Sequence, residues 1–234
     1  MVNTNVTFEK EEQISLDRLK LPAEPALLGE SGQSEKIGSL EESLPGEKGV
    51  RATAIPQTTP IELAEKAAVN ENLNKLAQMY NAEPEYLAYI VEVEKKFNLE
   101  PCELLAVIAQ ESGFKPQTRM DGGSLSYSTT QMKMPTAITS HMAITEYYKF
   151  DIPYPTHELL NNDKKYAAFL AGGYLRYLHD TYQDKYESYT AYNWGIGGRM
   201  TFYNKYGHFK SPYALKIANL AESFRQMIGE EYYV

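Results

Sequence analysis

The fold is decided by Leu104-Leu105-Ala106-Val107-Ile108-Ala109-Gln110-Glu111-Ser112-Gly113-Phe114, a continuous apolar run that ends in one carboxylate. If this run is a helix, Leu104, Val107 and Ile108 lie on the same face as Glu111. Partial desolvation and the negative end of the helix dipole both disfavour the charged carboxylate, so we expect a raised pKa for Glu111. A carboxylic acid of that kind donates a proton near neutral pH. The alternative interpretation is a surface glutamate at a helix end.

The composition separates an N-terminal arm from the rest of the chain. The chain has 234 residues, and every aromatic residue except Phe8 lies at or after Tyr80. A packed core is therefore expected in the C-terminal two thirds. Residues 1–59 are rich in Pro and Gly, carry more acid than base, and cannot bury enough apolar surface to fold alone. We predict that they form a low-complexity, extended and irregular arm, which serves as a linker or as a docking segment for a protein partner.

The remaining pattern predicts an all-α fold, because no convincing strand alternation is found. Proline opens several of the expected helices, as is favourable in the first helical turn. A connecting helix is predicted in residues 60–83, and one domain in residues 84–230. We expect residues 122–130 to form a loop, since turn-forming residues dominate them. Helices are expected over 60–80, 84–97, 101–112, from 131 or 135 to about 149, from 163 onward, around 191–194 and over 212–228.

Four segments follow one another in a specific order. They are Glu111-Ser112-Gly113-Phe114, Ser126-Tyr127-Ser128-Thr129-Thr130-Gln131, Ala191-Tyr192-Asn193-Trp194-Gly195 and Pro212-Tyr213-Ala214-Leu215-Lys216-Ile217. Together they resemble the catalytic domain of the soluble lytic transglycosylases, which is goose-lysozyme-like and belongs to the lysozyme superfamily. The resemblance covers about residues 84–228 and implies a lysozyme-like helical domain.

One segment departs from the family pattern. The family has Gly-Leu-Met before its glutamine, whereas this chain has Ser128-Thr129-Thr130 before Gln131. We expect the loss of the glycine to alter the backbone of this loop and its approach to a sugar.

The resemblance implies a role for each matching residue. Glu111 is implied to be the sole catalytic acid/base. It would protonate the glycosidic oxygen between N-acetylmuramic acid and N-acetylglucosamine in peptidoglycan strands, and then take the proton of the sugar's own 6-hydroxyl. One carboxylate suffices because this nucleophile belongs to the substrate and is already held close, and the product is a 1,6-anhydro sugar. The implied substrate-binding residues are Gln131 and Asn193 on the acetamido sugar, Tyr192 beside Glu111, Tyr213 along the cleft and Ser112 in the turn after Glu111.

Each of these residues also has a structural interpretation. Tyr192 also suits a core, and Tyr213 suits a core equally well. Gln131 also suits the start of a helix, and Ser112 suits bonding the turn after Glu111. Trp194 is a candidate for stacking on a sugar, and the tyrosine-rich stripe over 166–177 is interpreted as core packing.

Two other functions stay open. Asp121 lies between Glu111 and Gln131, and it would make the enzyme a hydrolytic muramidase if it activated a water molecule. A lone Asp before Gly-Gly is more often a turn residue. The third function is a catalytically weak structural or glycan-binding assembly protein, which the long arm and Ser128-Thr129-Thr130 favour.

Composition also excludes several classes of protein. The net charge of −8 argues against nucleic-acid binding, which needs a basic patch. No cofactor and no metal site are expected, because the four His are scattered and the single Cys102 is interpreted as a buried structural thiol. No apolar stretch has the length of a membrane span.

The first residues have neither a basic nor an apolar signal-peptide region, so we expect delivery to the cell wall in a virion or through an export machine.

Overall fold

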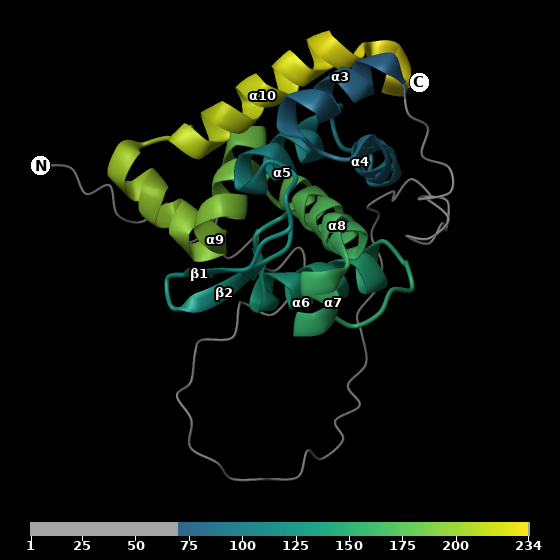
Figure 1. The fold of residues 1–234 in the computed structure, drawn as a ribbon. Helices are drawn as coiled ribbons and strands as arrows, with labels where there is room; N and C mark the ends of the chain where they lie inside the picture. The colour runs from purple at the N-terminus through teal and green to yellow at the C-terminus, as the bar shows by residue number, and fades with distance from the viewer. Residues whose placement is uncertain (1–69, 234) are drawn as a thin grey trace, which may run out of the picture.

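The computed structural model describes residues 70–233, and it is predominantly helical (Figure 1). Two elements depart from α-helix or strand: η1 is a π-helix that continues α6, and η2 is a short 3-10 helix. The elements in chain order are α3 (Glu71–Tyr80), α4 (Pro84–Lys96), α5 (Glu103–Ser112), β1 (Arg119–Asp121), β2 (Ser124–Tyr127), β3 (Met132–Lys133), α6 (Met134–Met142), η1 (Ala143–Tyr147), α7 (His157–Asn162), α8 (Lys164–Tyr182), α9 (Lys185–Tyr206), α10 (Pro212–Ile228) and η2 (Glu230–Tyr233).

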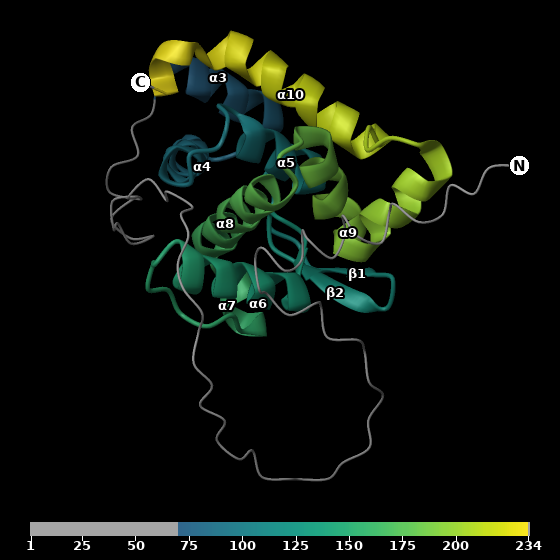
Figure 2. The ribbon, with the colours of Figure 1, turned by 180° about the vertical axis from the view of Figure 1, so that it is seen from behind.

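Helix α8 occupies the centre of the fold and contacts α4, α5, α6, α7 and α9. Helix α10 covers one side and packs along α3, α5 and α9, as seen from behind in Figure 2. The small antiparallel sheet, with strand order β1-β2-β3, lies away from α10, near the middle of α9. The prediction of a predominantly helical, all-α domain is confirmed. Within residues 70–233, no helix is long and apolar enough to cross a membrane.

Most predicted helices of the C-terminal domain are present. Helices α4 and α10 start at the prolines expected to open them, and Asp163 caps α8 by accepting hydrogen bonds from two backbone amides. Gly113 takes the expected C-cap position of α5. The helix predicted over 60–80 is seen from Glu71, and its expected start lies outside the described residues, as does the arm over 1–59.

The prediction of a loop over 122–130 is wrong in part, because residues 124–127 form β2. A two-residue turn, Gly122-Gly123, joins β1 to β2, and both residues have positive φ, 55° and 82°. Turns of this kind match the twist of a hairpin and favour glycine at both positions. The strands are too short for their alternation to be visible in the sequence.

Helix α8 approaches α4 and α5 closely at Gly172. A Cβ atom there would lie 2.5 Å from Cγ1 of Val93 on α4 and 3.3 Å from Cδ2 of Leu104 on α5. The next residue, Gly173, is equally close to Ile144, with 2.4 Å from a built Cβ to the Ile144 side chain. These contacts bring the backbone of α8 against the helix that carries Glu111.

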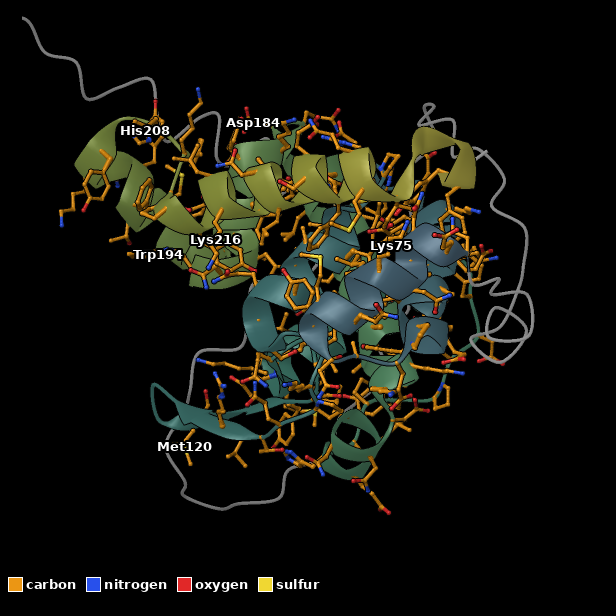
Figure 3. The ribbon with its side chains drawn as sticks, turned by 45° about the horizontal axis from the view of Figure 1, so that its top comes forward. Lys75, Met120, Asp184, Trp194, His208 and Lys216 are labelled. Carbon is orange, nitrogen blue, oxygen red and sulfur yellow. The ribbon has the colours of Figure 1, made fainter. Side chains whose placement is uncertain are left out.

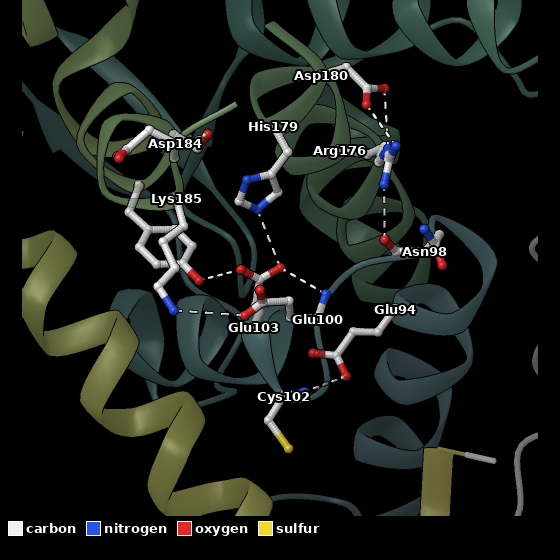
Figure 4. Close-up of polar contacts among 12 residues, drawn as sticks. Glu94, Asn98, Glu100, Cys102, Glu103, Arg176, His179, Asp180, Asp184 and Lys185 are labelled. Carbon is white, nitrogen blue, oxygen red and sulfur yellow. Dashed lines mark hydrogen bonds and ion pairs between the residues drawn. The ribbon is translucent and has the colours of Figure 1, made fainter. Parts of the chain in front are cut away.

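Two buried carboxylates hold the N-terminal end of α5 (Figure 4). Glu94 on α4 accepts hydrogen bonds from the backbone amides of Cys102 and Leu105, at 3.2 and 2.9 Å, and from the Tyr233 hydroxyl at 2.6 Å. Burial raises the pKa of the Glu94 carboxyl to about 8. These bonds satisfy amides that the first turn of a helix leaves without partners.

Glu103, in the first turn of α5, fastens the same end to α8 and α9. Its Oε2 accepts from the Glu100 amide at 3.0 Å and lies 3.3 Å from Nε2 of His179, while Oε1 accepts from the Tyr189 hydroxyl. Burial alone would raise the pKa of Glu103, but the His179 contact and these hydrogen bonds bring it below its usual value. Helix α5 is therefore fixed at the end opposite Glu111.

The thiol of Cys102 is buried at this end of α5, as predicted. Its sulfur lies 3.3 Å from the Tyr233 hydroxyl oxygen. Burial, together with the nearby Glu94 charge, raises the pKa of the thiol to about 12. A thiol that stays protonated is a poor nucleophile.

Candidate active site

A cleft of about 500 Å³ opens between the small sheet and the middle of α9. Clefts of this size are typical of small-molecule and substrate sites. Met120 on the hairpin and Trp194 on α9 are both part of its wall (Figure 3). The lining comes from the end of α5, from the sheet and the start of α6, from α8 and from α9, namely Glu111, Arg119, Met120, Ser126, Gln131, Met132, Lys133, Thr136, Tyr174, Tyr192, Asn193, Trp194 and Gly195.

Glu111 stands in the last turn of α5, half-buried, with its carboxylate in the cleft. Tyr213, in the first turn of α10, donates a hydrogen bond of 2.6 Å from its hydroxyl to Oε1 of Glu111. Burial and the Glu111 charge raise the pKa of Tyr213 well above its ordinary value, so this phenol stays protonated and remains a donor. Tyr213 is not part of the cleft lining and reaches Glu111 from α10, the helix that packs along α5.

Tyr192 contributes a second phenol beside Glu111. Burial and the Glu111 charge raise its pKa well above the ordinary value. Its hydroxyl is enclosed and has no hydrogen-bond partner among the residues that the structure describes. A buried polar group left without a partner costs about 1–3 kcal/mol, which a ligand in the cleft can recover. The Tyr192 ring lies 5.8 Å from the ring of Tyr174, another lining residue.

Gln131 and Asn193 both line the cleft, from the loop before β3 and from α9. The Gln131 side-chain amide donates to the backbone carbonyls of Gln117 and Ser128, each at 2.8 Å. Both N–H groups are therefore engaged, and the carbonyl oxygen is the group that can serve a ligand as an acceptor. Asn193 is exposed, immediately before Trp194.

Ser112, predicted as a substrate-binding candidate, is not among the lining residues. Its hydroxyl donates to the Thr129 carbonyl at 2.6 Å. The contact ties the end of α5 to the loop that carries Gln131, which agrees with the structural interpretation. Asp121 ends β1, opposite Ser124.

A model of the transglycosylase SLT domain matches residues 88–213, which is more than half of the chain. The chain belongs to the SLT transglycosylase family. It is a peptidoglycan lytic transglycosylase, a lyase that acts on glycan strands. Comparisons with curated proteins and with solved structures give no significant match.

The Gln131 loop of the SLT domain has a buried serine where the family pattern has glycine. Ser128, in the place of the family's glycine, has a φ of +59° and is fully buried. Thr129 shares a hydrogen bond of 2.5 Å with the Tyr86 hydroxyl and holds Ser112 through its carbonyl. Ser128 is therefore a left-handed serine, a conformation that L-residues adopt at a cost.

Replacing Ser128 with Gly is expected to stabilise the transglycosylase by about 1 kcal/mol. The change removes left-handed strain, and it removes a buried hydroxyl with no hydrogen-bond partner in the described part of the chain. The entropy of glycine offsets part of this gain. Urea unfolding measures the effect. Ser126→Gly, two residues earlier in β2, serves as the control and is expected to be destabilising; a lower midpoint for Ser128→Gly would contradict the prediction.

Several cleft residues of the SLT domain were not predicted from the sequence. Tyr174 was assigned to core packing, and it is both 2% exposed and part of the cleft floor. Arg119, Ser126 and Lys133 come from the sheet, of which only β2 falls within the predicted loop over 122–130. The signal in the sequence that could have revealed the hairpin is the pair Gly122-Gly123 between two short segments of alternating polar and apolar residues. Within residues 70–233, no group of His, Cys, Asp and Glu is arranged to hold a metal ion.

Proposed function

We propose that Glu111 is the single catalytic acid/base of this transglycosylase. The observation that carries the proposal is the Glu111 carboxylate in the cleft, with Oε1 held at 2.6 Å by a tyrosine that stays protonated. Glu111 protonates the glycosidic oxygen between N-acetylmuramic acid and N-acetylglucosamine. The carboxylate then accepts the proton of the 6-hydroxyl of the muramic acid as that oxygen attacks the anomeric carbon. The C1–O4 bond breaks, the C1–O6 bond forms, and the 1,6-anhydro product leaves without consuming water.

The neighbouring polar groups suit the substrate that this reaction needs. The Tyr192 hydroxyl, enclosed beside Glu111, is positioned to donate to the reacting sugar or to the carboxylate. The Gln131 carbonyl accepts from the N–H of an acetamido group, since its own N–H groups are engaged. Asn193 supplies donors and an acceptor at the cleft surface. Tyr213 positions Glu111, and Ser112 positions the Gln131 loop.

Mass spectrometry of digested cell wall tests the reaction type. Strands cut by the wild-type enzyme are expected to end in 1,6-anhydromuramic acid. A hydrolytic muramidase that uses Glu111 with Asp121 would instead leave reducing N-acetylmuramic acid ends. Those ends would then be absent from digests made with the Asp121→Asn variant. No cleavage of intact wall at any pH would favour the structural or glycan-binding protein.

We also propose that residues 1–59 dock the enzyme on a virion or secretion assembly that brings it to the cell wall. The composition of this segment supports the proposal, because it is acidic, rich in proline and poor in aromatic residues. Deleting residues 1–55 is expected to leave cleavage of purified wall unchanged and to abolish incorporation into the assembly. Incorporation at the wild-type level would overturn the docking role.

A further inference from the structure

Three residues form a straight row across the small sheet. Arg119 on β1 pairs with Ser126 on β2, and Ser126 pairs with Lys133 on β3. Directly paired residues in a sheet point to the same face. All three line the cleft, together with their neighbours Met120 and Met132.

The row brings two cations into the cleft of an acidic chain. The net charge is −8, yet the charged lining residues that the structure describes are Arg119, Lys133 and the single carboxylate of Glu111. Two strand spacings separate the Cα atoms of the two residues, roughly 10 Å. Arg119 is exposed, and its guanidinium donates to the neutral Gln117 side chain at 2.7 Å. An arginine with a neutral partner keeps its charge and donors available to an anion.

We propose that Arg119 and Lys133 form an anion subsite that binds carboxylate groups of the glycan strand, so that the enzyme selects anionic muramic-acid strands over neutral ones. The inference rests on the proposed function, because it concerns the substrate of that same cleft. Guanidinium groups bind carboxylates through paired, charge-assisted hydrogen bonds. Ser126, between the two cations, supplies a hydroxyl to the same group.

Peptidoglycan offers this carboxylate from two sources. Stem peptides carry free carboxylates along their length. Where the peptide is absent, the lactyl group of the muramic acid itself ends in a carboxylate. Both present the same chemistry to Arg119 and Lys133, and the two kinds of strand are separated by removing the peptides enzymatically.

Binding to purified strands tests the subsite without requiring turnover. The affinity is measured in the Glu111→Gln background for Arg119→Gln, Lys133→Gln and the double variant. Three probes are used: peptide-bearing strands, peptide-stripped strands with free lactyl groups, and stripped strands whose carboxylates are converted to methylamides. Lys75→Gln is the control, since Lys75 is an exposed lysine on α3 that pairs with Glu71 (Figure 3). All variants are checked for an unchanged thermal unfolding temperature.

The double variant is expected to bind carboxylate-bearing strands about 10- to 100-fold more weakly, as is typical of losing charge-assisted hydrogen bonds. The protein with Arg119 and Lys133 and the double variant are expected to bind the methylamide strands equally weakly. Lys75→Gln is expected to leave the affinity for every probe unchanged. A loss confined to peptide-bearing strands places the carboxylate on the stem peptide, and a loss confined to stripped strands places it on the lactyl group.

Wild-type affinity of the double variant for both carboxylate-bearing probes would overturn the subsite. The subsite would also be overturned if the protein that keeps Arg119 and Lys133 bound carboxylate-bearing and methylamide strands with equal affinity. Failure of the proposed function looks different: carboxylate-dependent binding would persist, while digests of the wild-type enzyme would lack anhydro ends.

Discussion

Glu111→Gln is expected to reduce turnover of cell wall by about 10²–10⁴-fold while the protein stays folded. The amide has the shape of the carboxylic acid but cannot donate the proton that the leaving oxygen needs. Its carbonyl oxygen can still accept the 2.6 Å hydrogen bond from Tyr213, so the local packing is retained. The loss is expected in kcat, with a small change in KM, because the change affects a proton transfer rather than sugar binding.

Release of soluble fragments from purified sacculi measures the rate, and circular dichroism confirms the fold. Glu85→Gln is a matched control, because it makes the same chemical change on the exposed surface of α4 and is expected to leave turnover unaffected. Turnover by Glu111→Gln at the wild-type rate would eliminate Glu111 as the acid.

Gly172→Ala is expected to destabilise the fold by about 1–3 kcal/mol, although alanine is the better helix former. Its Cβ would lie 2.5 Å from Cγ1 of Val93 and 3.1 Å from Cδ2 of Phe97, so α8 must move away from α4. Val93→Ala removes the closest methyl group. The double variant Val93→Ala/Gly172→Ala is therefore expected to be more stable than the sum of the two single changes indicates.

Denaturant unfolding of the wild type, both single variants and the double variant gives the coupling free energy. Gly197→Ala on α9 is the control, because nothing lies within 4 Å of its built Cβ, so alanine is expected to fit there without loss of stability. Additive single effects at positions 93 and 172 would mean that this contact does not limit the approach of α8.

The helices were predictable because their apolar runs are long and begin at clear signals. Pro84, Pro212 and Asp163 each stand where the structure starts a helix. The hairpin was missed because strands of two to four residues show no alternation. Only the Gly122-Gly123 turn indicated it, and a glycine pair is equally typical of a loop.

The site was predictable in part. One cleft is lined by Glu111, Gln131, Tyr192 and Asn193. Each of them stands in a segment whose order along the chain follows the family pattern, and this order is what pointed to them in the sequence. Which atoms meet was not predictable from that order. The Tyr213–Glu111 bond joins residues 102 positions apart, and it depends on how α10 packs along α5.

Tyr174 shows a further limit of periodicity. A helical stripe indicates which side of α8 is buried, but it does not say where along that side the core gives way to a cleft. Tyr174 lies at that transition, in contact with Tyr177 on one side and Tyr192 on the other.

Trp194 provides the enzyme with an optical signal of its own. It is the only tryptophan in the chain, it belongs to the cleft wall, and the residue is 48% exposed. A saccharide that covers the indole would exclude water from it and shift its emission to shorter wavelength. Titrating strands into the unlabelled protein therefore reports occupancy of the cleft directly, even for variants that no longer cleave.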